Sequence, residues 1–422
     1  MGSDETRDTR ALILHPDITS NPERREASFA LEEAVSLAAA LPGLVVAGAE
    51  IVRLPNPSPG LLFGKGKIED LAARIKADDI ELVLVDGPVT PVQQRNLERE
   101  WKVKLLDRTG LILEIFSDRA ATREGVLQVD MAHLSYQRTR LVRAWTHLER
   151  QRGGLGFVGG PGETQIEADR RAIDEQLVRL KRQLDKVVKT RTLHRDARAK
   201  VPFPIVALVG YTNAGKSTIF NRLTGARVLA KDMLFATLDP TMRTIELPSG
   251  REGILSDTVG FISDLPTQLV AAFRATLEEV LAADVILHVR DISHPETEAQ
   301  RDDVVGILEA LGVGEDRMVI EVWNKIDQVE DPDPLITAAA RKENTIVTSA
   351  LSDNGLAPLL EAIEAALSQG LRTEAVTVSH AEGRKRAWLF EQGVVDEERA
   401  TEDGWTLKVT WSDTHAARFQ RM

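Results

Sequence analysis

The sequence predicts an α/β protein whose largest domain is a doubly wound parallel sheet. Strand-like and helix-like patterns alternate regularly from Ile205 to Gln369, which is typical of helices that cover both faces of a parallel sheet. A shorter alternating region begins the chain, and two long amphipathic helical patterns lie between the two regions. At 422 residues the chain exceeds a single ordinary core, so we expect several domains.

The composition is that of a globular protein and excludes several classes. Hydrophobic residues make up 43% and charged residues 28% of the sequence, as is usual for soluble domains. No apolar run approaches the roughly 18 residues that span a bilayer, and the N-terminal segment lacks the apolar stretch of a secretory signal. The sequence has no cysteine, which excludes disulfides and thiolate metal sites. We therefore expect a cytoplasmic protein with no transmembrane segment, and a monomer as the simplest state.

The first region predicts a small α/β domain with a parallel-type sheet, because apolar strand-like stretches alternate with helical patterns. The strands are expected at Arg10–Leu14, Leu44–Val52 and Leu82–Val85, and the helices at Pro22–Leu41, Lys67–Ala77 and Pro91–Trp101. The turn Gly64–Lys67 has glycines and lysines that could hold a phosphate. Because the full phosphate-loop spacing is absent there, we expect a structural turn.

Two amphipathic helices should form a basic hairpin. Apolar residues recur at helical spacing from Val126 to Gln151 and again from Ile166 to Val187, and long helices joined by a short break pair antiparallel. The connection from Arg152 to Ile166 contains six glycines. Residues 126–200 carry 16 Lys and Arg against 9 Asp and Glu, although the whole chain has a net charge of −12. These features favour contact with RNA phosphates, and the alternative is a solvated charged face.

The patterns divide the chain into four predicted domains. Residues 1–120 form the small N-terminal α/β domain, residues 121–200 the long antiparallel helical hairpin, and residues 201–370 the doubly wound domain. Residues 371–422 contain shorter strand-like runs such as Trp405–Trp411, which predict a small C-terminal α+β domain.

The most specific motif follows the strand-like stretch Ile205–Gly210. It has the spacing of a P-loop and opens a helical pattern. Its glycines let consecutive backbone amides point at phosphates, Lys216 reaches the β and γ oxygens, and the Ser217 hydroxyl binds Mg²⁺. The predicted nucleotide-binding residues of this loop are Gly210, Tyr211, Thr212, Asn213, Ala214, Gly215, Lys216, Ser217 and Thr218.

Guanine selectivity requires a carboxylate that accepts from both N1–H and the exocyclic amine of the base. Asp327 can provide it, since it lies in Asn324-Lys325-Ile326-Asp327 directly after the strand-like stretch Met318–Trp323, where ligands bind in such sheets. Ser349 and Ala350, after another short strand-like stretch, are expected to close over the base with backbone amides.

Two further segments predict a sensor of the γ-phosphate. Asp257-Thr-Val-Gly260 ends a strand-like stretch and provides a carboxylate near Mg²⁺, without a direct bond to the ion, and an amide of Gly260 for the γ-phosphate. The segment Phe235–Thr241 is the place for a threonine that binds Mg²⁺. Thr237 is the first choice and Thr241 the alternative. In this order the motifs predict a P-loop GTPase.

The sequence also predicts slow intrinsic hydrolysis of GTP. A Ras-like enzyme carries a water-orienting glutamine after the glycine equivalent to Gly260, whereas this chain has Phe261. Lys216 remains as a catalytic group, and Asn213 is a candidate ligand for a K⁺ ion that would take the place of an arginine finger. Activation by potassium is therefore a hypothesis that depends on Asn213.

Several long motifs resemble those of the HflX GTPases, and the resemblance extends to about Gln369. The segments are Gly64-KGK, Gln93-QRNLE, Leu105–Ser117, Leu141–Gln151, Gly153–Arg171, Gly210-YTNAGKST and Phe235-ATLDPT. The resemblance implies a GTPase that binds the large ribosomal subunit and splits stalled or idle ribosomes into subunits under heat or other stress. It also implies a glycine-rich helical tip near ribosomal RNA, an N-terminal domain that docks on the ribosome, and some use of ATP. Asp327 favours guanine.

The expected partners are GTP or GDP, the large ribosomal subunit and its RNA, and not DNA. The RNA-contact candidates are Arg138, Arg140, Arg143, Arg150, Arg152, Gly153, Gly154, Gly156, Gly159, Gly160, Gly162, Arg170 and Arg171. Two alternatives remain: an Obg-like GTPase that acts in ribosomal subunit assembly, and a nucleotide-gated interaction protein with a partner other than the ribosome.

Overall fold

The structure is a computed structural model that describes residues 8–22, 24–151, 161–198, 203–226, 234–235, 241–263, 279–314, 317–369 and 371–420. The chain divides into two compact units. The first contains Met1–Asp185 together with Leu229–Asp239 and Val259–Thr276, and the second contains the rest of the chain. The two inserted segments contain parts of the expected γ-phosphate sensor, Phe235 and Gly260 among them.

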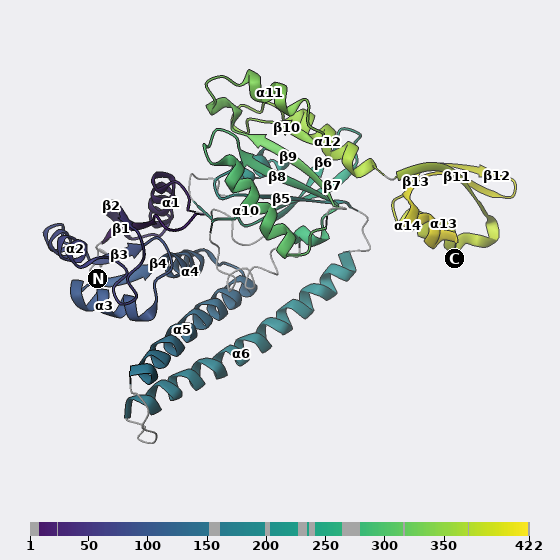
Figure 1. The fold of residues 1–422 in the computed structure, drawn as a ribbon. Coiled ribbons are helices and arrows are strands. Elements are labelled where there is room, and N and C mark those ends of the chain that lie inside the picture. Colours follow the sequence, from purple (N-terminus) through teal and green to yellow (C-terminus); the bar gives the residue numbers. More distant parts are fainter. Residues whose placement is uncertain are drawn as a thin grey trace, which may run out of the picture. The chain divides into compact units, whose positions relative to one another are not determined.

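The N-terminal region forms a four-stranded parallel sheet in the order β2-β1-β3-β4 (Figure 1). The elements are β1 (Thr9–Ile18), α1 (Ala27–Ala39), β2 (Leu44–Leu54), α2 (Lys65–Ala77), β3 (Leu82–Val85), α3 (Pro91–Trp101) and β4 (Lys104–Asp107). The strand β4 was not predicted, because its four residues contain only two apolar side chains. Lys67 of the glycine and lysine turn forms an ion pair with Glu50, as suits a structural turn.

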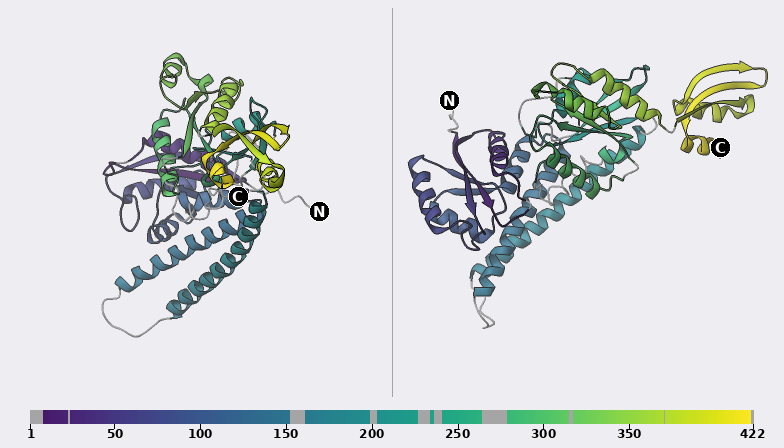
Figure 2. Two further views of the ribbon diagram at one scale, coloured as in Figure 1. Left: turned by 90° about the vertical axis from the view of Figure 1, so that its right-hand side faces the viewer. Right: turned by 45° about the horizontal axis from the view of Figure 1, so that its top comes forward.

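Three helices follow this sheet: α4 (Arg108–Arg119), α5 (Arg123–Gln151) and α6 (Pro161–Arg198). Arg138 of α5 pairs with Asp174 of α6 at 2.9 Å, so the two long helices form the predicted hairpin (Figure 2). The structure corrects the extent of the glycine-rich connection, which was expected to reach Ile166. The helix α6 already begins at Pro161 and includes Gly162, and proline is favoured in the first turn of a helix.

The hairpin is anchored to the N-terminal sheet by a polar cluster at the end of β4. Asp107 accepts a hydrogen bond from the hydroxyl of Tyr136 at 2.5 Å and forms an ion pair with Arg140. Gln94 accepts a second hydrogen bond from Arg140. Arg140, expected among the RNA contacts, is therefore committed to this anchor.

The second unit contains a six-stranded sheet in the order β10-β9-β8-β5-β7-β6, parallel except for the edge strand β6. Its strands are β5 (Ile205–Gly210), β6 (Thr241–Glu246), β7 (Glu252–Asp257), β8 (Val285–Asp291), β9 (Met318–Asn324) and β10 (Thr345–Val347). Its helices are α7 (Lys216–Thr224), α10 (Thr297–Ala310), α11 (Asp333–Ala339), α12 (Leu356–Ser368) and the short η1 (Ile326–Gln328). This is the doubly wound sheet that the alternating pattern predicted.

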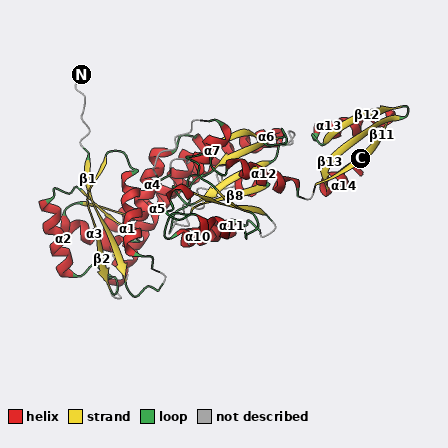
Figure 3. Cartoon of the chain, turned by 90° about the horizontal axis from the view of Figure 1, so that it is seen from above, coloured by secondary structure: helices red, strands yellow, loops and turns green. Residues whose placement is uncertain are grey.

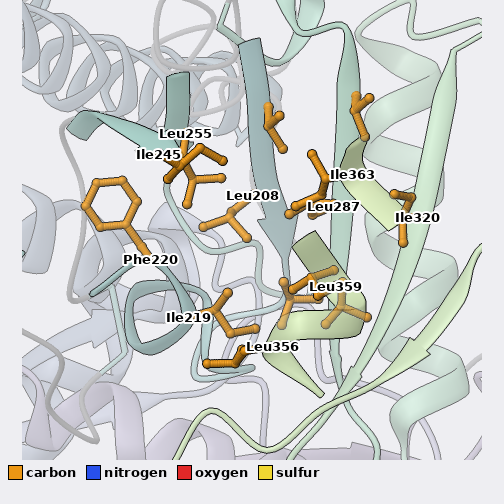
Figure 4. Packing of buried hydrophobic residues seen from close by; sticks show 14 of the residues in the cluster. Leu208, Ile219, Phe220, Ile245, Leu255, Leu287, Ile320, Leu356, Leu359 and Ile363 are labelled. Atoms are coloured by element: carbon orange, nitrogen blue, oxygen red, sulfur yellow. The ribbon is translucent and has the colours of Figure 1, made fainter. Parts of the chain in front are cut away.

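An apolar layer holds the helices α7 and α12 to this sheet (Figure 4). Leu208, Leu287 and Ile320 from three adjacent strands pack with Ile219 of α7 and Leu359 of α12, and all are at most 1% exposed. Burial of each side chain contributes roughly 1.5–3 kcal/mol. The layer fixes the start of α7, and with it the loop that precedes this helix.

The C-terminal region is a separate small α+β fold, as predicted (Figure 3). An antiparallel sheet in the order β11-β13-β12 is formed by β11 (Leu371–Ser379), β12 (Val395–Thr401) and β13 (Gly404–Ser412). The accompanying helices are η2 (His380–Glu382), α13 (Gly383–Glu391) and α14 (Asp413–Gln420). The core includes Trp388, Leu407 and Trp411.

None of the helices in the described parts of the chain is both long and apolar enough to cross a bilayer.

Candidate nucleotide site

The backbone turns sharply where β5 ends and the P-loop begins. Gly210 has a φ of 149°, and a Cβ there would lie 2.1 Å from the carbonyl oxygen of Val289. Gly215 has a φ of 99°, and a Cβ there would lie 2.1 Å from the side-chain amide of Asn324. Only glycine fits either position without a shift of the surrounding atoms. The loop therefore leads directly into the N-terminus of α7, whose free amides suit phosphate.

Lys216 is the buried cation of this loop. Its ammonium group donates to the carbonyl oxygens of Gly210 at 3.1 Å and Tyr211 at 2.7 Å, so the side chain folds back along the loop. Burial lowers the pKa of Lys216 to about 8, while Asp257 acts in the opposite direction and Lys325 adds to the lowering. A phosphate group placed at this loop would restore the charge balance.

Ser217 and Asp257 provide the oxygen atoms expected around Mg²⁺. The Ser217 hydroxyl donates to Oδ2 of Asp257 at 2.7 Å. Asp257 is fully buried at the end of β7, and the next residue, Thr258, donates its hydroxyl to the carbonyl of Leu208 at 2.6 Å. A hydroxyl and a carboxylate in contact form a donor set of oxygen atoms only, and this set fits Mg²⁺ completed by phosphate and water.

Asn324 joins three sequence motifs. Its side-chain amide donates to the carbonyl of Ala214 in the P-loop at 2.9 Å. Its side-chain oxygen accepts from the hydroxyl of Thr348 at 3.2 Å and from the amide of Ala350 at 3.1 Å. The amide of Ala350, expected to face the base, is thus used to tie the base-side loop to the P-loop.

The segment expected to recognise the base presents Asp327 to solvent. Lys325 adopts a left-handed backbone conformation, with a φ of 64°, and pairs with Asp291 at 2.8 Å. The following short helix η1 carries Asp327 with an exposed side chain, whereas Ser349 is only 1% exposed. The segment leaves a carboxylate free to accept from a base beside the loop.

Arg222 contacts the candidate site at a position that the sequence did not reveal. From α7 it donates to the carbonyls of Ala350 at 3.1 Å and Leu351 at 2.8 Å, and it pairs with Asp353. It therefore supports the base-side loop from the helix that follows the P-loop. No motif spacing marks an arginine that acts through backbone carbonyls more than 120 residues away.

The structure places the remaining site candidates as follows. Asn213 is exposed with a φ of 59°, a conformation that asparagine tolerates better than most residues, so its backbone is a second reason for an asparagine here. Thr218 lies in the first turn of α7. Thr237 lies outside the described residues, and Thr241 is the first residue of β6, paired opposite Asp257. Phe261, which follows Gly260, is 1% exposed.

The RNA-contact candidates differ in their exposure and in their contacts, and some lie outside the described residues. Arg170 and Arg171 of α6 are exposed, and Arg171 lies 3.8 Å from Glu167. Arg138 is partly exposed in its pair with Asp174. Arg143 and Arg150 belong to α5, but their side chains lie outside the described residues. The candidates Arg152, Gly153, Gly154, Gly156, Gly159 and Gly160 also lie outside them.

A P-loop before a helix, a serine and an aspartate in contact, and an exposed Asp327 at the carboxyl edge of one sheet define a P-loop GTPase. Models of protein families cover almost the whole chain. Residues 28–117 match "GTP-binding GTPase N-terminal", residues 119–198 "GTP-binding GTPase Middle Region", residues 205–325 "50S ribosome-binding GTPase" and residues 334–422 "HflX C-terminal domain".

Comparison with whole protein sequences leads to the same family. The chain is 49% identical over 414 residues to a GTPase HflX from Magnetococcus marinus, covering 97% of this chain and 94% of the relative. It is 45% identical over 349 residues to GTPase HflX from Escherichia coli, covering 82% of each chain. The chain therefore belongs to the HflX family of GTPases, as the motifs indicated.

Proposed function

We propose that the protein is a GTPase that binds the large ribosomal subunit and dissociates stalled or idle ribosomes into subunits under stress. The observation that carries this proposal is a basic helical hairpin in a chain whose nucleotide domain matches a family of 50S ribosome-binding GTPases. The exposed arginines of α6 provide positive charge for RNA phosphates, and the glycine-rich connection lets backbone approach RNA closely.

The nucleotide site supports a division of labour among its residues. Lys216 and the amides of the P-loop would bind the β and γ phosphates, Asp327 the guanine base, and the Gly260 amide the γ-phosphate. Ser217 and Thr237 would hold Mg²⁺, with Asp257 accepting from Ser217. When bound, Mg²⁺ neutralises charge that develops on the phosphates.

Hydrolysis by the isolated protein should be slow, because the buried side chain of Phe261 cannot orient a water molecule. A partner must then complete the site. We propose that the large ribosomal subunit does so, and that Asn213 takes part by binding K⁺. Purified protein with large subunits should turn over GTP faster in potassium than in sodium, and equal rates would remove the role of K⁺.

A charge reversal on the helical hairpin tests whether the large ribosomal subunit is the partner. The double variant Arg170→Glu, Arg171→Glu should lower subunit-stimulated hydrolysis by at least tenfold, because it replaces two attractive contacts with two repulsive ones. The rate without subunits should stay unchanged. Splitting of ribosomes, followed by sedimentation in a sucrose gradient, should fall in parallel, and the loss should grow with ionic strength.

Arg399→Glu is the matched control. Arg399 is 81% exposed and lies 3.7 Å from Glu397, whereas Arg171 is 78% exposed and lies 3.8 Å from Glu167. The control variant should behave like the wild type. If GTP hydrolysis by the wild type does not respond to large subunits at all, the ribosomal proposal is wrong, and a GTPase with another partner becomes the better reading.

A further inference from the structure

Three residues outside the six-stranded sheet form a network that holds the segment after Gly260. Arg108, the first residue of α4, donates through Nη2 to the carbonyl oxygen of Ser263 at 3.2 Å and to its hydroxyl at 2.8 Å. The Ser263 hydroxyl in turn donates to Glu33 of α1 at 2.8 Å. Arg108 also pairs with Glu33 and, through Nη1 at 2.6 Å, with Asp86 at the end of β3.

This cluster, consisting of Arg108, Glu33, Asp86 and Ser263, is largely buried, and its members are joined to one another by hydrogen bonds and ion pairs. The side chains of Arg108, Glu33 and Asp86 are only 8%, 15% and 5% exposed. Burial by itself would lower the pKa of Arg108, but Asp86 and Glu33 raise it above its ordinary value. Such a site keeps its geometry, because separating the charges would leave a buried ion without a partner.

The segment held by the cluster is the one expected to sense the γ-phosphate. Ser263 lies three residues after Gly260, and the intervening Phe261 and Ile262 are each 1% exposed. Described residues of this segment belong to the same compact unit as α1 and α4. In GTPases such a segment is commonly ordered only when the γ-phosphate is bound, and ordering it costs conformational entropy.

A second contact on the same helix involves the segment expected to carry the Mg²⁺ threonine. Phe116 of α4 and Phe235 meet edge to face with ring centroids 4.6 Å apart, and both rings are at most 2% exposed. Phe235 has a φ of 57°, a conformation that a bulky residue keeps only when its surroundings hold it. The helix α4 therefore contacts both segments that flank the γ-phosphate position in sequence.

We propose that Arg108 and Glu33 are positioning residues for GTP, which hold the segment after Gly260 in an ordered conformation before the γ-phosphate binds. This inference rests on the proposed GTPase function. In this proposal the cluster supplies the ordering, so GTP binding does not have to supply it. GDP does not contact Gly260 through a γ-phosphate, so its affinity should be insensitive to the cluster.

The test compares the dissociation constants of fluorescent GDP and a fluorescent non-hydrolysable GTP analogue in the full chain. Ser263→Ala removes the hydrogen bonds of the hydroxyl to Arg108 and Glu33 and leaves the backbone carbonyl in place. The dissociation constant of the GTP analogue should rise about fivefold to tenfold, whereas that of GDP should stay within twofold of the wild-type value. Glu33→Gln should act in the same direction. Ser263→Thr keeps a hydroxyl and should restore most of the difference.

Tyr136→Phe is the matched control, since it removes a partly buried hydrogen bond to Asp107, the residue before Arg108 in the sequence. Its ratio of GTP-analogue to GDP affinity should equal that of the wild type. The inference is wrong if Ser263→Ala and Glu33→Gln both leave the ratio of GTP-analogue to GDP affinity unchanged, or if both bind the GTP analogue more tightly than the wild type does. A wild type that binds neither nucleotide would instead overturn the GTPase proposal itself.

Discussion

The parallel four-stranded sheet and the mostly parallel six-stranded sheet both end in polar residues at the carboxyl edges of their parallel strands, but they use these residues differently. At the edge of β1, β3 and β4, His15, Asp86, Asp107 and Arg108 are engaged with one another and with neighbouring side chains. At the edge of β5 and β9, a glycine loop precedes a helix, and Asp327 stays exposed. A carboxyl edge thus becomes a ligand site when its backbone amides and carboxylates are left available.

Loss of Arg108 should have the largest effect on stability. It would show that the polar residues at the carboxyl edge of the four-stranded sheet have a structural role. Arg108→Met leaves the carboxylates of Glu33 and Asp86 buried without the guanidinium group that pairs with both. We therefore expect the free energy of unfolding to fall by about 3–5 kcal/mol. Urea titration followed by far-ultraviolet circular dichroism measures the change. Arg53→Met, which removes an 81% exposed partner of Asp17, should cost less than about 1 kcal/mol. Equal effects would contradict the assignment.

Loss of the carboxylate at the second edge should change binding rather than stability. Asp327→Asn replaces one of the two carboxylate oxygens that would accept from N1–H and the exocyclic amine of guanine with an NH2 donor, and the free energy of GTP binding should weaken by about 1.5–3 kcal/mol. Affinity for xanthosine triphosphate should rise, since its base carries a carbonyl that an amide can donate to. Isothermal titration with both nucleotides measures this switch. Asp331→Asn, an exposed residue nearby, should leave both affinities unchanged.

The pH dependence of binding sharpens the difference further. Since burial lowers the pKa of Lys216 to about 8 in the free protein, its positive charge is present below that pH and is lost above it. GTP affinity should be constant up to pH 7 and fall about tenfold by pH 9, because binding then requires uptake of a proton. Fluorescence titration across this range tests the expectation. In Lys216→Met the affinity for GTP should be weak. Its decrease between pH 7 and pH 9 should lose the part that is due to Lys216.

The smallest expected effect concerns Arg222, which supports the second edge through backbone carbonyls. Arg222→Ala should weaken GTP binding by about 0.5–1.5 kcal/mol, the value of an ordinary hydrogen bond, through loosening of the loop at Ser349–Leu351. The dissociation rate of fluorescent GDP is the sensitive measurement. Arg243→Ala removes an exposed arginine that donates to the carbonyl oxygen of the adjacent Met242, and it should leave that rate unchanged.

Local signals explain which parts of the fold were predictable. The strand β3 and the helix α3 have the predicted boundaries, since Leu82–Val85 is a continuous apolar run and Thr90 begins α3 with a capping box followed by Pro91. The strand β4 was missed because it is short and its apolar content is low. The start of α6 was predicted five residues late, because glycines outweighed the proline signal.

The order of the nucleotide motifs was determined by the sequence alone, because each motif needs particular residue types at fixed local spacing. Gly210, Lys216, Asp257 and Asp327 were predicted as site residues in this way. The tertiary structure decided what joins them. Asn324 reaches a carbonyl 110 positions away, and Arg108 reaches a serine 155 positions away. Such contacts arise from the packing of distant segments, and no local spacing records which buried charge will find which partner.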